Sequence, residues 1–262
     1  MSDQFDLYVC PKCRGRLHRE TDGLLCSGCK KRFPITDGIP DFLLLNPEES
    51  TNPFLHGFGK ILAPIYESPF WFPIMLRLLA GWKAPTLRSV VESVCQKIDS
   101  IRGCVLDVAT GTGTYGRHIA NRERRVYGID ISWEMLKKGQ QFVDHERITN
   151  MYFGRADAES LPFEDRAFDG CLFCGSLHIF PDTKKILTEV GRTMKCGSPL
   201  VVTTIIHGDK GILRDRGLRT RKPRRFRVFE LSELEEAVAA TDFSDFEPDV
   251  HGSVILFTAK KK

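Results

Sequence analysis

The sequence has no long apolar run. Its most apolar segment, residues 61–82, is broken by prolines and by the charged residues Glu67 and Arg77, so it falls short of the roughly 20 apolar residues that a membrane-spanning helix needs. Residues 1–6 contain two acids and no apolar stretch, which argues against a signal peptide. We therefore expect a cytoplasmic protein that does not span a membrane.

The sequence also lacks a marked excess of one charge. The net charge of its 262 residues is +4, which does not by itself imply a polyanionic partner. Residues 210–227 are the exception, because nine lysines and arginines stand there against the single acid Asp215. Such a run is ordinarily a solvated face, but it can also bind a nucleic acid.

Cysteine, by contrast, is plentiful, and its spacing is informative. Cys10-Pro11-Lys12-Cys13 and Cys26-Ser27-Gly28-Cys29 are two C-x-x-C pairs separated by twelve residues, the spacing of a four-cysteine zinc ribbon. A segment of about 45 residues buries little apolar surface, so a bound metal would supply most of its folding free energy. We predict that one structural zinc ion is bound by Cys10, Cys13, Cys26 and Cys29.

A third C-x-x-C, at Cys171 and Cys174, has a different meaning. It lies inside an apolar segment predicted to be a strand, and side chains three residues apart on a strand point to opposite faces. These two thiols are therefore not expected to share a metal ion.

The stretch from Val105 to Gly116 is an apolar strand that runs into a glycine-rich turn. Gly111, Gly113 and Gly116 form the pattern G-x-G-x-x-G, in which glycines let the backbone approach a ligand at a helix N-terminus. The pattern alone leaves two candidate ligands, a nicotinamide dinucleotide and S-adenosylmethionine. Asp107 favours the second, because a carboxylate there would repel a pyrophosphate but attract a cation.

From residue 101 onward, strand and helix patterns alternate, which predicts an α/β fold with a parallel sheet. Seven strands are expected, at residues 104–108, 125–130, 151–156, 167–174, 199–206, 243–250 and 253–259. Ser132 has the character of a helix N-cap. The chain is thus expected to divide into a zinc ribbon at residues 1–45, an intervening segment at 46–100 and the main domain at 101–262.

The intervening segment begins with a linker and continues with an aromatic-rich stretch at residues 54–82. This stretch has no strand alternation, so short helices broken at prolines are expected. Two roles remain open for it, namely packing the ribbon onto the main domain and forming a lid over an apolar substrate pocket. Residues 86–98 then show the apolar spacing of a surface helix.

Four motifs, in order, resemble those of the class I S-adenosylmethionine-dependent methyltransferases. They read VLDVATGTG at 105–113, GIDISWEML at 128–136, DAESLPF at 157–163 and FDG at 168–170. The similarity is strongest to the branch of ubiquinone and menaquinone C-methyltransferases, the methyltransferase type 11 domain. Residues 8–43 resemble the small zinc-ribbon proteins that activate tRNA and other methyltransferases. The resemblance implies a Rossmann-like seven-stranded sheet, mostly parallel, with the last strand antiparallel.

The resemblance also implies how the glycine-rich turn would bind S-adenosylmethionine. Backbone groups around Ala109, Gly111 and Gly113 would face its methionine and ribose portions, since glycine tolerates close approach. Asp107 would lie near the positively charged methionine portion.

The other implied cofactor contacts come from later strands. Asp130 lies nineteen residues after Gly111, where its carboxylate can accept hydrogen bonds from both ribose hydroxyls. Asp157 and the Ala158 amide would bind the adenine edge, a contact that distinguishes this reading from a dehydrogenase. The remaining implied cofactor contacts are Ile131, Met135, Cys174 and Gly175.

His178 is the candidate catalytic base. It follows the fourth strand, where related enzymes line the acceptor pocket, and an ordinary histidine pKa suits proton removal near neutrality. The alternative is a pocket-wall histidine without a proton role, because methyl transfer depends mainly on positioning.

His178 and the aromatic stretch favour a small apolar or aromatic molecule as the methyl acceptor. The second choice is an RNA base, held by the ribbon and by residues 210–227.

Overall fold

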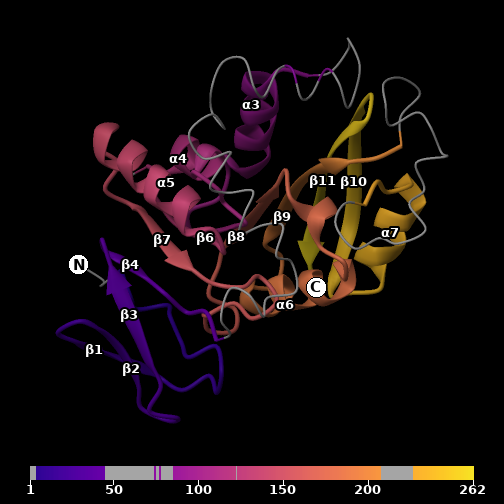
Figure 1. Cartoon of the computed structure of the whole chain (residues 1–262). Helices are drawn as coiled ribbons and strands as arrows, with labels where there is room; N and C mark the ends of the chain where they lie inside the picture. Colours follow the sequence, from indigo (N-terminus) through magenta and orange to yellow (C-terminus); the bar gives the residue numbers. More distant parts are fainter. Residues whose placement is uncertain (1–3, 45–73, 75–76, 78–84, 122, 208–226) are drawn as a thin grey trace.

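The structure is a computed structural model that describes residues 4–44, 74, 77, 85–121, 123–207 and 227–262 (Figure 1). The aromatic stretch at 54–82 and the basic run at 210–227 therefore lie almost wholly outside the described residues. Across the described ranges, no helix is long and apolar enough to cross a bilayer.

Seven strands form the large sheet, in the order β10-β11-β9-β8-β5-β6-β7 (Figure 1). Strands β5 to β9 are parallel, and β11 runs antiparallel to both of its neighbours, β9 and β10. This arrangement confirms the predicted Rossmann-like sheet. The strands are β5 (Gly103–Val108), β6 (Arg124–Asp130), β7 (Met151–Arg155), β8 (Gly170–Cys174), β9 (Pro199–Ile205), β10 (Phe243–His251) and β11 (Val254–Lys261).

Helices cover both faces of this sheet. Helices α3, α4 and α5 contribute to the core on one face, and α6 and α7 to the core on the other. The Ser132 hydroxyl accepts a hydrogen bond from the Met135 amide at 3.4 Å, which confirms the predicted N-cap. The helices are α3 (Leu87–Ile98), α4 (Thr114–Ile119), α5 (Trp133–His145), α6 (Thr183–Thr193) and α7 (Leu231–Ala239), with a 3-10 turn, η2 (Leu177–Ile179).

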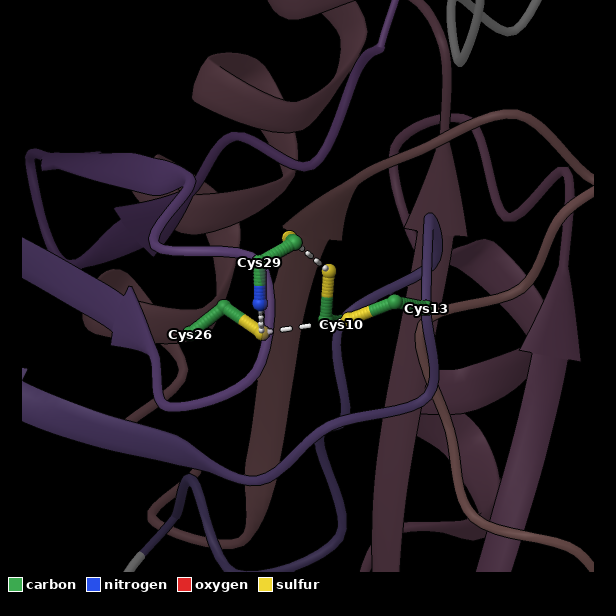
Figure 2. Close-up of side chains that lie close together, drawn as sticks. All are labelled: Cys10, Cys13, Cys26 and Cys29. Atoms are coloured by element: carbon green, nitrogen blue, oxygen red, sulfur yellow. Dashed lines mark hydrogen bonds between the residues drawn. The ribbon is translucent and has the colours of Figure 1, made fainter.

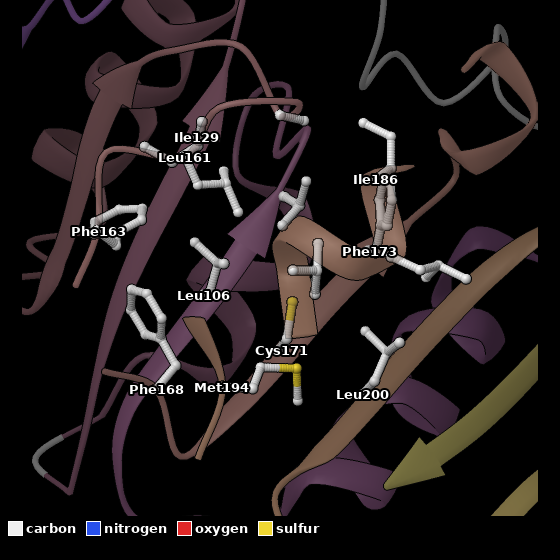
Figure 3. Packing of buried hydrophobic residues seen from close by; sticks show 14 of the residues in the cluster. Leu106, Ile129, Leu161, Phe163, Phe168, Cys171, Phe173, Ile186, Met194 and Leu200 are labelled. Atoms are coloured by element: carbon white, nitrogen blue, oxygen red, sulfur yellow. The ribbon is translucent and has the colours of Figure 1, made fainter. Parts of the chain in front are cut away.

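The two cores are separated by the sheet itself. Cys171 belongs to the core on the α6 side, together with Leu106 and Phe168 (Figure 3), whereas Cys174 belongs to the core on the α3 side. The prediction that these two thiols point to opposite faces is therefore confirmed.

The N-terminal ribbon has a small antiparallel sheet of its own, in the order β1-β2-β3-β4. Its strands are β1 (Leu17–Glu20), β2 (Gly23–Cys26), β3 (Arg32–Thr36) and β4 (Ile39–Pro40). The chain leaving β4 runs alongside β7, the edge strand of the large sheet (Figure 1), and the Phe42 amide donates a hydrogen bond to the Arg155 carbonyl at 2.7 Å. The ribbon thus covers one open edge of the large sheet, which would otherwise expose unpaired backbone groups.

Aromatic side chains join the ribbon to the large sheet in one continuous core. The Tyr8 ring lies 4.8 Å from the rings of both Phe42 in the ribbon and Phe163 in the main domain. Tyr127 from β6 packs edge-on against Tyr8 at 5.9 Å. Because these rings belong to the same buried cluster, the ribbon is packed against the domain as part of its interior.

Candidate functional site

The predicted cofactor residues gather where β5, β6, β7 and β8 end. These four parallel strands are neighbours in the sheet, so their carboxyl ends lie side by side. Strand β5 pairs with β6 on one side and with β8 on the other, which makes its end the point where the strand order reverses. In open α/β sheets, ligands bind in the crevice at such a point.

The turn after β5 has an unusual backbone. Ala109, Gly111 and Gly113 have φ angles of 52°, 58° and 78°, a region that is strained for a residue with a side chain. A Cβ on Gly113 would lie 2.6 Å from Met151 Cε, so a side chain there would displace the end of Met151, and the positive φ also favours glycine. The strain at Ala109 makes this turn a candidate functional segment.

Asp107 lies beneath this turn, with only 1% of its surface exposed. Its Oδ2 accepts a hydrogen bond from the Thr110 hydroxyl at 2.6 Å, and the Gly116 amide also bonds to the carboxylate. Burial raises the pKa of Asp107 to about 7. A cation bound nearby would favour the ionised form of this carboxyl group.

Asp130 fixes the turn to the end of β6. Its Oδ2 accepts a hydrogen bond from the Gly111 amide at 2.8 Å, and its Oδ1 accepts one from the Ser132 amide, also at 2.8 Å. Burial raises the pKa of Asp130, while these amides act in the opposite direction. The Ile131 amide also bonds to the carboxylate, and because a carboxylate has about four lone pairs, it can still accept a hydrogen bond from a ribose hydroxyl.

The loop after β7 contains the predicted adenine contacts. The Ala156 amide donates to the Asp130 carbonyl at 3.1 Å, so this loop starts directly beside Asp130. Asp157 accepts a hydrogen bond from the Glu159 amide at 2.9 Å, and burial raises its pKa. Ala158 is buried beside it. Ile131 and Met135 follow Asp130 in the chain, Ile131 just before the N-cap Ser132 and Met135 in the first turn of α5.

The end of β8 carries Cys174 and Gly175, the remaining residues predicted to contact the cofactor. Gly175 has a φ of 78°, and a Cβ built on it would meet no atom of the described residues within 4 Å. The next residue, Ser176, is 7% exposed, and its hydroxyl has no hydrogen-bond partner among the described residues. Sequence reasoning did not single out Ser176. The signal was its position directly after a strand that ends at the predicted site.

His178 lies in the 3-10 turn that follows β8. Its Nδ1 is 3.4 Å from the Thr204 hydroxyl, and its backbone carbonyl accepts a hydrogen bond from the Arg227 amide at 2.7 Å. The surrounding protein lowers the pKa of His178 to about 4 by desolvation. The expectation of an ordinary histidine pKa is therefore wrong, and the imidazole is neutral near pH 7.

The four ribbon cysteines form a separate cluster. Their sulfur atoms all lie within 4.8 Å of one another, and the Cys10–Cys29 and Cys13–Cys26 sulfur pairs are 3.6 and 3.4 Å apart (Figure 2). Thiolates at about 2.3 Å from a tetrahedral ion lie about 3.8 Å from one another. The donor set and its geometry therefore fit a tetrahedral metal such as zinc.

The two halves of the cysteine cluster are built alike. The Cys10 and Cys26 amides donate to the carbonyls five residues later, at 3.0 and 2.9 Å, and Arg14 and Lys30 both have a φ of 59°. A Cβ on Gly15 would lie 3.0 Å from the Cys26 sulfur. Each C-x-x-C thus forms a tight knuckle, and glycine leaves room for the sulfur atoms.

Comparisons with known proteins agree with both parts. The family described as methyltransferase domain matches residues 105–197, and the family described as Trm112p-like protein matches residues 5–38. Over 99% of its length the chain is 22% identical to an uncharacterised chloroplast methyltransferase of Arabidopsis thaliana, covering 79% of that protein.

A second relative aligns with a shorter part of the chain. The demethylmenaquinone methyltransferase of Porphyromonas gingivalis is 39% identical over 103 residues, which are 37% of this chain and 42% of that enzyme. This chain therefore aligns with less than half of that relative.

A solved structure shows the same fold. Phosphoethanolamine N-methyltransferase 2 of Haemonchus contortus, solved with S-adenosyl-L-methionine, has a TM-score of 0.59 at 16% identity over 75% of this chain and 59% of that one.

Proposed function

We infer that this chain, which belongs to the class I S-adenosylmethionine-dependent methyltransferases and carries an N-terminal Trm112p-like ribbon, methylates a small-molecule acceptor. Within that family, the acceptor and the residues that act on it are our proposal. The quinone methyltransferase among its relatives supports a small apolar or aromatic acceptor.

The observation that carries the proposal is the position of Asp130. Its carboxylate holds the strained turn at Gly111 on one side and the start of α5 at Ser132 on the other. A ribose bound there would find an acceptor already oriented, and the loop at Asp157 would lie on the adenine side. The methyl donor supplies the reactive sulfonium, and the chain's part is to hold it in line with the acceptor.

We propose that the end of β8 forms the acceptor side of the site. No atom of the described residues fills the space beside Gly175, Ser176 offers a buried hydroxyl, and His178 offers a neutral imidazole. With its imidazole neutral, His178 accepts a hydrogen bond from the molecule to be methylated. It removes a proton from that molecule only if the molecule is acidic. His178→Gln should lower turnover and leave the affinity for S-adenosylmethionine unchanged. Unaltered turnover would show that His178 only lines the pocket.

We also propose that the four-cysteine cluster binds one zinc ion in a structural role. All four ligand positions are taken by protein sulfur, which leaves no open coordination position for a substrate. The cluster supplies folding free energy to the ribbon and takes no part in methyl transfer.

Calorimetry tests the cofactor site. Wild type should bind S-adenosylmethionine, and Asp130→Ala should weaken binding by about a hundredfold or more, because charge-assisted hydrogen bonds to the ribose and the anchor for the turn are both lost. Asp144→Ala, which changes an exposed carboxylate on α5, is the matched control and should bind as wild type does. No binding to wild type would refute the enzyme assignment.

A labelling experiment tests the acceptor. Methyl-labelled cofactor would be incubated with the protein and either a small-molecule extract or total RNA, and the labelled fraction identified. Label in the extract supports the proposal. Label in RNA alone would overturn it in favour of an RNA methyltransferase.

A further inference from the structure

The loop predicted to hold adenine continues directly into a contact with the ribbon. Within residues 160–163, the Ser160 hydroxyl donates to the Pro11 carbonyl at 3.3 Å, and the Val9 amide donates to the Pro162 carbonyl at 2.9 Å. Both ribbon residues lie next to Cys10, a predicted metal ligand. The metal knuckle and the cofactor loop are therefore in direct contact through backbone and side chain.

Arg14 makes the strongest of these contacts. Its guanidinium donates to the Leu161 and Phe163 carbonyls at 2.8 and 3.3 Å and pairs with Glu189 of α6 at 2.9 Å. Glu189 in turn accepts from the Leu161 amide at 2.8 Å. Arg192 binds the same two carbonyls, and its guanidinium donates to the Leu161 carbonyl at 3.3 Å and to the Phe163 carbonyl at 2.9 Å. Arg14 and Arg192 therefore both bind the backbone of this loop, and both also pair with Glu189.

The side chains of this loop are anchored as well. Leu161 and Phe163 point into the core on the α6 side, beside Leu106 and Phe168 (Figure 3). Because the side chains are buried and the carbonyls are clamped, the loop has little freedom to move while both arginines are in place.

The position of Arg14 is set by the knuckle. Arg14 directly follows Cys13, its amide donates to the Cys10 carbonyl at 2.8 Å, and its φ of 59° is unfavourable for arginine. Such a conformation persists only where the surrounding structure enforces it, and here the two thiolates closing on one metal ion would do so. Without the metal, the backbone of Arg14 would no longer be held in this conformation, and its side chain would no longer be positioned to bind the loop.

We propose that Arg14 is a positioning residue for the cofactor site, through which metal bound by the four cysteines sets the conformation of residues 157–163 and so the affinity for S-adenosylmethionine. The proposal rests on the proposed function, which places adenine at Asp157. By linkage, S-adenosylmethionine must in return strengthen metal retention by the same factor.

The test compares the full chain with Arg14→Gln, each measured with zinc bound and after chelation. Arg16→Gln is the matched control, because Arg16 lies exposed on the same ribbon two residues away. Elemental analysis confirms that both variants retain zinc, and calorimetry measures the dissociation constant for S-adenosylmethionine.

Arg14→Gln with zinc bound should bind S-adenosylmethionine about tenfold more weakly than wild type, a coupling of ordinary size. Chelation should weaken wild type and Arg16→Gln by a similar factor and add little to Arg14→Gln. Arg14→Lys, which keeps one donor group, should fall between wild type and Arg14→Gln. Equal affinity of the zinc-bound Arg14→Gln and wild type, or chelation effects of equal size in both, would overturn the proposal.

Hydrogen exchange at the Leu161 amide, measured without cofactor, separates this proposal from the proposed function. Exchange should be faster in zinc-bound Arg14→Gln than in wild type or Arg16→Gln, because the bond from Leu161 to Glu189 loses its support from Arg14. If wild type binds no S-adenosylmethionine, the proposed function fails, and this exchange rate alone shows whether Arg14 positions the loop. If chelation unfolds the chain, the zinc-bound variants decide the outcome.

Discussion

The ribbon and the large sheet keep their shapes for different reasons. The ribbon is built around four cysteine sulfur atoms that lie within 4.8 Å of one another, and around the two similar knuckles that carry them. Its strands are short, because β1 to β4 have two to five residues each. In the large sheet, every residue of β8 is buried, and helices cover both faces. We therefore expect the small ribbon to depend on bound metal and the large sheet to depend on packing. Because the aromatic cluster around Tyr8 belongs to both regions, we also expect the large sheet to be sensitive to the state of the ribbon.

Losing a metal ligand should give the largest effect. Cys26→Ser is expected to lose the zinc and to lower the thermal midpoint of the whole chain by about 10 °C or more, because an unfolded ribbon withdraws Tyr8, Phe33 and Phe42 from the shared core. Elemental analysis and thermal unfolding measure the two effects. Cys196→Ser, at an exposed thiol outside the ribbon, is the control. A Cys26→Ser midpoint equal to that of the control would show that the two regions are independent.

A buried charge should make the large sheet sensitive to pH. The pKa of Asp107 rises from 3.8 to about 7 on folding, so the native state binds this proton more tightly than the unfolded state does. Stability contributed by the protonated group is present below pH 4 and is lost as pH rises toward 7.

Asp107→Asn removes this titration. Relative to wild type, the variant should gain stability between pH 4 and pH 8, by at most about 4 kcal/mol. Urea unfolding across this range measures the difference, with the exposed Asp144→Asn as control. Parallel stability curves for Asp107→Asn and wild type would show that the carboxyl group titrates normally.

Two glycines with similar positive φ angles test packing against the large sheet. Gly113 and Gly197 have φ angles of 78° and 80°, but a Cβ on Gly113 would meet Met151 Cε at 2.6 Å and the Phe153 ring at 3.0 Å, whereas one on Gly197 would meet no atom of the described residues within 4 Å. Alanine should therefore cost about 1–3 kcal/mol more at Gly113 than at Gly197, in urea unfolding. Equal costs would mean that the conformation alone, and no close packing, requires glycine at Gly113.

Most of the large sheet was predictable because its strands are long, apolar and separated by clear helix patterns. The prediction placed the fourth strand at residues 167–174, but β8 begins at Gly170. The reason is tertiary, since the Phe168 amide donates to the Thr193 carbonyl at 3.0 Å and the Asp169 carboxylate accepts from the Cys104 amide at 2.9 Å. Apolar character alone does not reveal these partners.

The candidate site was predictable where a residue acts through its place in a local motif. The cysteine knuckles and the glycine turn are of this kind, because spacing of a few residues dictates their backbone. Ser176 and the value of the His178 pKa were not predictable, since both depend on burial by distant segments.

The sequence alone specified a four-cysteine ribbon, a glycine-rich turn and the order of strands and helices, because each is encoded within a few neighbouring residues. It gave no indication that Arg14 reaches Glu189, a residue 175 positions away, or that the ribbon covers the edge strand β7. Contacts of this kind arise only when the folded sheet brings distant segments together, and they connect the four-cysteine cluster to the loop proposed to hold adenine.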